Sequence, residues 1–287
     1  MATVVERVVA ARSRLEAAGL SPADAALDAD VLARHVLGWD RASLITRGRS
    51  NEPDGFERTF EALVSRRARR EPVAQIVGVR EFWGLEFEVT PDVLTPRPET
   101  ELVVEEALAF AREYVCRHVI DVGTGSGCLA VAIALELPAA RVTATDASAA
   151  ALAVARRNAA RHAVDDRVTF GCGDLLEGTI GRADLIISNP PYIPDADVLD
   201  LQPEVVKYEP HAALSGGPTG LEVMSRLFVQ AADHLEERGR LIVEFGFGQA
   251  ANVVRLAERT GWRVVGVRED LQGIPRTLVA RSVLSAT

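Results

Sequence analysis

The sequence is poor in three features, and each shortage excludes a class of protein. Cysteine occurs only as Cys116, Cys128 and Cys172, an odd number without C-x-x-C spacing. We therefore expect buried free thiols and neither a disulfide framework nor a zinc site. No apolar run approaches the roughly 18–20 residues of a membrane span, and the first residues lack the layout of a signal peptide. Lysine occurs once, as Lys207. Together these shortages predict a cytoplasmic protein without a membrane partner.

Positive charge is in deficit, and the deficit lies in one part of the chain. The net charge is −9, yet residues 1–72 hold 12 Arg against 11 acidic residues, which leaves 20 basic and 30 acidic residues for the remainder. A body this acidic repels phosphate backbones, so we expect no stable binding to nucleic acid. The arginines within residues 66–70 have two interpretations. They can contact RNA, or they can form a charged last helical turn, which the helix dipole favours; we prefer the second.

The first 72 residues have the pattern of a small helical bundle. Ser21 followed by Pro22 is typical of an N-cap and first turn, and Gly38 is typical of a helix end. Apolar residues at helical spacing predict helices from about residue 4 to near residue 19, and over 22–37, 41–47 and 54–70. Nothing in this segment has catalytic spacing, and we assign it as one domain, 1–72.

A short linker is expected to follow. Residues 74–79 and 82–89 alternate apolar and polar side chains, and Gly84 lies between them. Period-two alternation around a glycine predicts a β-hairpin, which we place in a linker over 73–94.

The remainder, 95–287, alternates strand and helix. This order predicts an α/β fold with a seven-stranded, mostly parallel, Rossmann-like sheet whose ligands bind at the carboxyl ends of the strands. Residues 193–218 lack a clear pattern, and a loop of that length inside a compact domain favours a function. The expected strands are 117–122, 141–146, 167–171, 183–188, 239–245, 263–269 and 277–283. The expected helices are about 99–114, 127–138, 148–161, 219–237 and 248–261.

A glycine turn follows the first expected strand and predicts a cofactor site. The turn reads Gly123-Thr124-Gly125-Ser126-Gly127 and opens an apolar helix. Glycine lets the backbone pass close to a ligand, and the helix start presents free N–H groups. Its spacing is G-x-G-x-G, which differs from the G-x-G-x-x-G of dinucleotide sites.

Two acidic residues follow the next two strands. Asp146 ends the second strand, where a carboxylate can accept both hydroxyls of a ribose. Asp174 follows the third strand, where it can accept the amino group of an adenine, with Leu175 beside the ring. Each alone is typical of a turn or cap, but their places at consecutive strand ends indicate a nucleotide-like cofactor.

The fourth strand runs into Asn189-Pro190-Pro191-Tyr192. The two prolines lack N–H groups and keep the preceding residues out of the helical region, so a stiff, extended loop is expected. Asn189 offers a carbonyl acceptor and an amide donor, and Tyr192 offers an aromatic face. This lip can hold a planar NH₂ group between two acceptors and a ring.

The glycine turn, Asp146, Asp174 and N-P-P-Y together resemble a class I S-adenosylmethionine-dependent methyltransferase. Three flanking motifs make the chain similar to the HemK family, the N5-glutamine methyltransferases of peptide chain release factors. These are R-E-P-V-A-Q-I-V-G over 70–78, P-R-P-E-T-E over 96–101 and G-I-P-R over 273–276. The similarity covers nearly the whole chain and is weakest over residues 1–70. Leu175 departs from members that carry an aromatic residue there.

The resemblance implies the cofactor and the partner. S-adenosyl-L-methionine would bind at residues 123–127, Asp146, Asp174, Leu175 and Asn189, and S-adenosyl-L-homocysteine would leave. The substrate would be the glutamine of the Gly-Gly-Gln motif in a release factor, bound at residues 189–192. Residues 95–287 would form the methyltransferase domain, and 1–72 would dock the substrate protein.

We expect Asn189, Pro190 and Tyr192 to be catalytic, with no metal. The Asn189 side-chain oxygen and the Pro190 carbonyl can accept the two amide N–H bonds, and Tyr192 can pack against the amide plane. Glu244, at the end of the fifth strand, is interpreted as a brace for a loop. Three alternatives stay open: a ribosomal-protein glutamine methyltransferase, an N6-adenine methyltransferase of nucleic acid, and a module that binds the cofactor without turnover.

Overall fold

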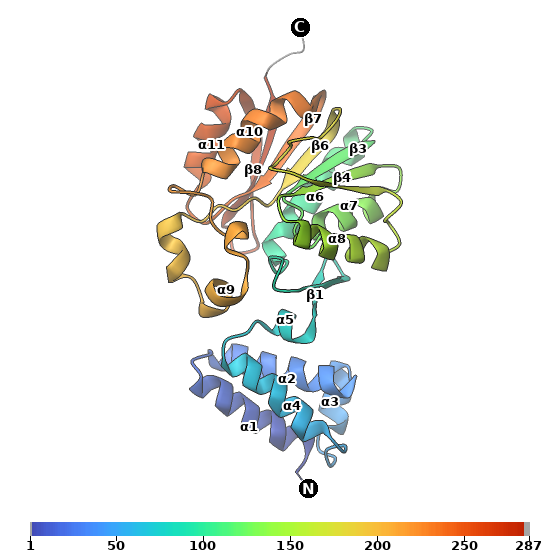
Figure 1. The fold of residues 1–287 in the computed structure, drawn as a ribbon, viewed down its shortest axis with the longest axis vertical. Coiled ribbons are helices and arrows are strands. Elements are labelled where there is room, and N and C mark those ends of the chain that lie inside the picture. Colours follow the sequence, from blue (N-terminus) through green and yellow to red (C-terminus); the bar gives the residue numbers. More distant parts are fainter. Residues whose placement is uncertain (1, 284–287) are drawn as a thin grey trace. The chain divides into compact units, whose positions relative to one another are not determined.

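The computed structural model describes residues 2–283 and divides them into two compact units (Figure 1). The first unit is helical and contains the chain up to Val79 together with Gln202–Tyr208. The second contains Arg80–Leu201 and the described residues from Glu209 onward. A short segment from the middle of the sequence therefore belongs to the N-terminal unit. No helix within residues 2–283 is long and apolar enough to cross a membrane.

The helical unit begins as its sequence predicts. Thr3 and Glu6 form a capping box at the start of the first helix, and Ser21 accepts a hydrogen bond from the Asp24 N–H at the start of the second. Gly38 ends that second helix with φ of 62°, a left-handed conformation that glycine adopts without strain. The helices are α1 (Val4–Ala17), α2 (Pro22–Leu37), α3 (Arg41–Arg47), α4 (Phe56–Ala68), α5 (Val73–Val77) and α9 (Pro203–Tyr208).

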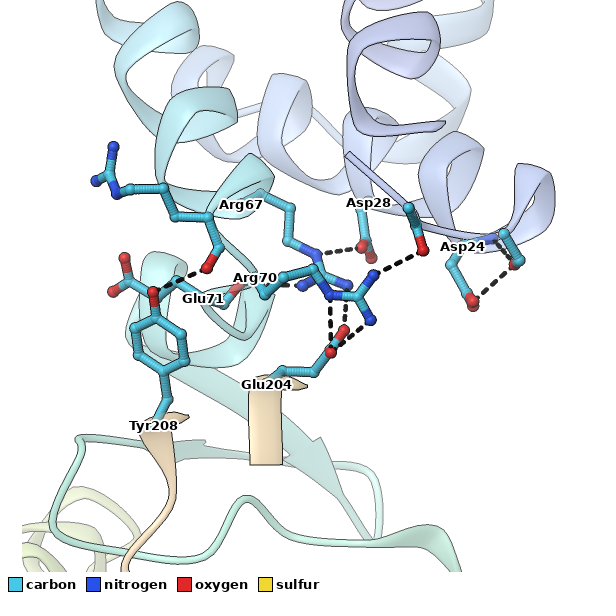
Figure 2. A network of polar contacts seen from close by, with 10 residues as sticks. Asp24, Asp28, Arg67, Arg70, Glu71, Glu204 and Tyr208 are labelled. Carbon is cyan, nitrogen blue, oxygen red and sulfur yellow. Dashed lines mark hydrogen bonds and ion pairs between the residues drawn. The ribbon is translucent and has the colours of Figure 1, made fainter. Parts of the chain in front are cut away.

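A network of ion pairs holds α9 in the helical unit (Figure 2). The Arg67 guanidinium lies between two carboxylates, 2.6 Å from Asp28 and 2.9 Å from Glu204. Arg70 approaches the same Glu204 at 2.6 Å and also donates to the Gly19 carbonyl at 2.8 Å. The side chain of Arg67 is 7% exposed and that of Glu204 is 13% exposed. These charges are therefore removed from water together and neutralise one another.

This network bears on the two interpretations of residues 66–70. Arg66 and Arg67 occupy the last turn of α4, and Arg66 pairs with Glu71. Arg67 and Arg70 pair with carboxylates inside the unit, as described above. Three of the four arginines thus have internal partners, which favours the structural interpretation over RNA contact.

The linker differs from its prediction in one half. Residues 74–79 do not form a strand: Val73–Val77 is the helix α5, and only β1 (Val79–Phe82) and β2 (Leu85–Glu88) pair. Pro72 begins α5 by accepting from two N–H groups of its first turn, and Gly78 ends it with φ of 79°. One helical turn is too short for its period to be read from the sequence. The predicted hairpin turn at Gly84 is confirmed, with positive φ at Trp83 and Gly84.

The second unit contains the predicted seven-stranded sheet, and the fold class is confirmed. Its strand order is β5-β4-β3-β6-β7-β9-β8, and β9 runs antiparallel to both of its neighbours. The strands are β3 (His118–Val122), β4 (Arg141–Asp146), β5 (Val168–Cys172), β6 (Ala183–Ser188), β7 (Leu235–Glu244), β8 (Trp262–Glu269) and β9 (Pro275–Ser282). All seven lie where the sequence predicts them, although β7 begins four residues earlier.

Both faces of this sheet are covered by helices (Figure 1). Successive strand residues point to opposite faces, so Leu185 and Ile187 pack on one side and Ile186 on the other. The first side carries α6 (Glu101–Glu113), α7 (Cys128–Glu136) and α8 (Ala149–Arg161), and the second carries α10 (Glu222–His234) and α11 (Ala250–Arg259).

Two further expectations are wrong in part. Residues 193–218 contain the 3₁₀ turns η2 (Asp195–Asp200) and η3 (His211–Ala213) as well as α9. Pro194, Pro203 and Pro210 stand at the starts of these elements, where proline favours a helical turn rather than breaking it. Of the three thiols expected to be buried, Cys172 is exposed. Burial raises the pKa of the Cys128 thiol to about 12, so this thiol is protonated and unreactive.

Candidate active site

A cavity of about 450 Å³ lies in the second unit, where the carboxyl ends of β3, β4 and β6 meet. Its volume is that of a small-molecule site. Seven predicted site residues line it: Gly123, Gly125, Asp146, Asp174, Leu175, Asn189 and Pro191. The structure therefore brings together residues that are up to 68 positions apart in the sequence, at the edge that the strand pattern predicts.

The glycines of the turn have two different structural roles. Gly123, Gly125 and Gly127 all have positive φ, and a side chain on either of the first two would meet no atom within 4 Å. A side chain on Gly127 would instead lie 3.0 Å from Ala155 of α8. The first two glycines thus leave the cavity wall open, and the third lets α7 and α8 pack closely. Gly127 does not line the cavity.

Thr124 and Ser126 also lie outside the cavity lining, because their side chains point into the protein. The Thr124 hydroxyl donates to Asp121 at 2.6 Å, and Asp121 also accepts from the Ala130 N–H at 3.2 Å. Asp121 is fully buried, and burial raises the pKa of its carboxyl to about 7. Asp121 therefore fixes the glycine turn from inside the protein. It was not among the predicted site residues, although an acidic residue inside the apolar strand β3 is unusual and could have identified it.

Asp146 is fixed by the backbone around it. Its Oδ2 accepts from the Gly125 N–H at 2.9 Å, and its Oδ1 accepts from the Ser148 N–H at 2.8 Å. Each carboxylate oxygen keeps a lone pair for a further donor. The residue can therefore accept two hydroxyls without first changing its rotamer.

Asp174 and Leu175 follow β5 and line the cavity. Asp174 pairs with Arg226 of α10, and both side chains are about half exposed. Leu175 has φ of 57°, a strained conformation for a branched residue, and its carbonyl accepts from the Thr145 hydroxyl at 2.8 Å. The carboxylate is already partly neutralised, so a ligand amino group would share it with a guanidinium.

Asn189 lies at the end of β6, and its amide has a fixed orientation. The Nδ2 donates to the Thr100 hydroxyl at 3.0 Å, which leaves the Oδ1 free to accept. Pro190 is buried outside the lining and Pro191 lines the cavity. The acceptor function predicted for Asn189 is thus available.

Tyr192 lies outside the cavity lining, and both its side-chain hydroxyl and its backbone carbonyl form hydrogen bonds. Its hydroxyl donates to Glu244 Oε1 at 3.3 Å, and its carbonyl accepts from Gln249 Nε2 at 2.8 Å. Burial, with the nearby Glu244 carboxylate, raises the pKa of the Tyr192 hydroxyl above its usual range. The hydroxyl is therefore neutral, and the residue is positioned by Glu244 at the end of β7 and by Gln249 after it.

Besides Ala147, Ser148 and Ala151, which adjoin Asp146, three more distant segments of the lining were missed in the sequence. They are residues 92–94 after the hairpin, residues around Pro210 and Ser215, and Val223 with Arg226 on α10. These residues have no ligand-like spacing of their own. They reach the cavity only because the fold returns distant loops to the same edge of the sheet.

Two family models match this chain. The methyltransferase small domain covers residues 100–217, and the PrmC N-terminal domain covers residues 8–78. Among solved structures, a methyltransferase from Pyrococcus furiosus shares 20% identity at a TM-score of 0.52, covering 76% of this chain and 98% of that one. The hMettl16 catalytic domain in complex with the MAT2A 3′UTR hairpin 6 shares 16% identity at a TM-score of 0.58, covering 77% and 82%. These two likenesses show the fold.

Fold, cavity and family models together define an S-adenosylmethionine-dependent methyltransferase. Relatives over almost the full length narrow the class. The release factor glutamine methyltransferase of Cereibacter sphaeroides is 45% identical over 95% of this chain and 96% of its own length. That of Geobacter sulfurreducens is 45% identical over 90% of each. The chain belongs to the release factor glutamine methyltransferase family.

Proposed function

We propose that the cavity binds S-adenosyl-L-methionine through the residues gathered around it. The turn at Gly123 and Gly125 leaves room for a close approach, and the anchored Asp146 has the free lone pairs that a ribose needs. Asp174 and Leu175 offer a carboxylate and an apolar side chain to an adenine. These features fit the molecule, which supplies a methyl group on a cationic sulfur when bound.

We propose further that the methyl acceptor is the N5 amide nitrogen of the glutamine in the Gly-Gly-Gln motif of peptide chain release factors. The observation that carries this proposal is the Asn189 orientation, because its Oδ1 faces away from Thr100 and can accept a substrate N–H. The Pro190 carbonyl supplies a second acceptor. Because the prolines have no N–H, the loop offers few donors that would occupy this carbonyl. The names of the curated relatives support the same substrate.

The protein's task in this chemistry is positioning. A carboxamide nitrogen is a weak nucleophile because its lone pair is delocalised, so two acceptors that hold both N–H groups favour a pyramidal nitrogen as it attacks. The ring of Tyr192 would pack against the amide plane. The neighbouring prolines exclude water, which favours a step in which positive charge is lost. No residue has to remove the proton before the bond forms, because the methylated nitrogen is far more acidic.

The test is a side-by-side labelling experiment. The purified protein is given a labelled methyl donor with a release factor, a ribosomal protein and nucleic acid in separate reactions. Label in the Gly-Gly-Gln glutamine alone supports the proposal. Label in the ribosomal protein or in adenine would replace it with one of the alternatives, which the relatives do not favour.

The surroundings of this activity are also part of the proposal. We infer that the protein acts in the cytoplasm on a protein partner, without a stable complex with nucleic acid. The helical unit is proposed to dock the substrate protein, because it carries exposed apolar side chains that a partner would cover. Substitutions on its exposed apolar residues, such as Leu27 and Ile45, should raise KM for intact release factor more than for a short Gly-Gly-Gln peptide.

A further inference from the structure

Glu244 is a buried carboxylate beside the N-P-P-Y segment that the proposed chemistry does not use. It ends β7, is 1% exposed, and accepts from the Tyr192 hydroxyl through Oε1. Its Oε2 is buried without a hydrogen-bond partner. A buried carboxylate without a cationic partner within ion-pair distance is destabilising, so its presence at this position needs an explanation.

The hydroxyl of Thr100 is bonded to Asn189 and lies close enough to Glu244 to act on its carboxyl group. Thr100 is buried and accepts from Asn189 Nδ2, so its own proton points away from that donor and is available to a second acceptor. The Glu244 carboxylate is close enough for the Thr100 hydroxyl to favour its ionised form. An ionised carboxylate can only accept, and it therefore draws the Thr100 proton toward itself.

The direction of this donor chain decides which atom of Asn189 meets the substrate. With the Thr100 proton directed at Glu244, only the Nδ2 side of the amide fits against Thr100 Oγ1, and Oδ1 is left for the substrate. If the Thr100 proton pointed the other way, Asn189 would accept from it through Oδ1. The substrate amide would then meet Nδ2, a donor facing a donor.

We propose that Glu244 is a positioning residue that fixes the Asn189 amide, through Thr100, with its oxygen toward the substrate nitrogen. This inference rests on the proposed function, and it replaces the interpretation of Glu244 as a loop brace.

The groups around Glu244 make its charge adjustable near neutral pH. Burial raises the pKa of the Glu244 carboxyl to about 7, and Glu99 raises it further. The hydroxyls of Thr100 and Tyr192 and the guanidinium of Arg276 oppose that increase. A protonated Glu244 becomes a donor and can reverse the chain, so the orienting form is present above about pH 7.

The variants that test the proposal are Glu244→Gln and Thr100→Val. In the first, the amide oxygen can still accept, but the negative charge is lost and the new NH₂ group is a donor that competes for Thr100 Oγ1. In the second, the hydroxyl is removed. Each should lower kcat on a Gly-Gly-Gln peptide about tenfold or more, the scale of one lost hydrogen bond to a charged group, with the cofactor Kd within about twofold. The double variant should be no worse than the single variants.

A matched control lies one strand away. Thr277 on β9 is the register partner of Glu244 on β7. It is fully buried, and its hydroxyl has no hydrogen-bond partner. Thr277→Val removes a similar buried hydroxyl outside the chain from Glu244 to Asn189, and it should leave kcat unchanged. A loss in Thr277→Val equal to that in Thr100→Val would overturn the proposal.

A readout without methyl transfer separates this inference from the proposed function. In ¹⁵N-labelled protein without cofactor, the Asn189 side-chain NH₂ resonance, assigned by its loss in Asn189→Ala, should shift as pH passes through about 7. Glu244→Gln should abolish that shift, and kcat of the parent should rise over the same pH range. An identical shift in Glu244→Gln would refute the relay even if release factor is methylated. An absence of methylation with a normal NMR titration would refute only the substrate.

Discussion

Glu204 in the helical unit and Glu244 in the catalytic unit are both removed from water, and the protein treats them in opposite ways. Burial alone would raise the pKa of Glu204, but a backbone N–H and the guanidinium groups of Arg70 and Arg67 outweigh it, and the pKa is lowered. Glu244 has no such cation in hydrogen-bond contact, and its pKa is raised to about 7. The first carboxylate is charged at all physiological pH values, whereas the second titrates near neutrality.

The difference separates a structural charge from a functional one. In the helical unit every charge of the network in Figure 2 that links α2, α4 and α9 has an opposite charge beside it. In the catalytic unit Asp121 and Glu244 each keep one oxygen without a partner. Incomplete pairing of a buried carboxylate is costly, and perturbed pKa values of this kind concentrate at functional sites.

Removing the central cation of the paired network should have the largest effect on stability. Arg67→Ala leaves Asp28 and Glu204 buried with one guanidinium fewer, so the free energy of unfolding should fall by about 3–5 kcal/mol. Urea unfolding followed by circular dichroism measures it. The control is Arg14→Ala, whose pair with Glu61 is roughly half exposed and should cost less than about 1 kcal/mol. Equal losses in the two variants would show that the network contributes no more than a surface pair.

The largest effect on activity should come from Asn189→Ala. It removes the acceptor at the end of β6, and kcat should fall about 10²–10³-fold, as when one preorganised group of an active site is lost. Calorimetry should show a cofactor Kd within about threefold of the parent value. The exposed Asn252→Ala is the control and should change neither quantity. A kcat that survives Asn189→Ala would refute the assigned mechanism.

The unpaired carboxylate should give a stability that falls as pH rises. Folded Glu244 binds its proton up to about pH 7 while the unfolded residue releases it near 4.5, so the folded state holds more protons in that window and loses stability with increasing pH. The full shift corresponds to about 3 kcal/mol. Glu244→Gln should remove this contribution, so its stability should fall less than that of the parent between pH 5 and pH 8.

Denaturant midpoints measured at several pH values provide the comparison. The control is Glu237→Gln, an exposed carboxylate of the same strand, which should keep the slope of the parent. Glu204 has the opposite sign, because its contribution is lost only as pH falls below about 4.5. A parent protein whose stability rises from pH 5 to pH 8 would reverse the assignment for Glu244.

The smallest effect is expected at Asp174, where the carboxylate is paired but exposed. Asp174→Asn should raise the Kd for S-adenosylmethionine about two- to tenfold, the value of one hydrogen bond, with kcat unchanged. Arg226→Ala removes the ion pair and keeps the acceptor, so it should leave the Kd equal or lower. If Arg226→Ala weakens binding as much as Asp174→Asn, the ion pair rather than the carboxylate contributes to the site.

The catalytic unit could be predicted closely from sequence because its signals are local. Each strand is a short run rich in branched apolar residues. Gly123, Asp146 and Asn189 lie where strands end, so the parallel part of the sheet places them together. Asp92, Pro210 and Arg226 have no such marker. Their place in the cavity depends on how loops return across the sheet, which no local pattern encodes.

The polar network of the helical unit could not be predicted for a different reason. Arg67 and Glu204 are 137 positions apart, and each alone is typical of a solvated helix surface. Thr100 and Glu244 illustrate the same limit in the catalytic unit. Whether a buried carboxylate has an ionic partner, as Glu204 does, or lacks one, as Glu244 does, follows from tertiary packing.

The path of the chain through the two units has a consequence for protein engineering. Gln202–Tyr208 is assigned to the helical unit, although the residues before and after it belong to the catalytic unit. The two units are therefore not consecutive along the sequence. A fragment that starts at Arg80 keeps Glu204 but lacks Arg67 and Arg70, which pair with it. It also keeps Tyr208 but lacks Gln75, which donates to the Tyr208 carbonyl. A self-standing catalytic domain requires replacement of this insert by a short neutral connector. Domain exchange between relatives should likewise transfer residues 1–79 together with residues 202–208.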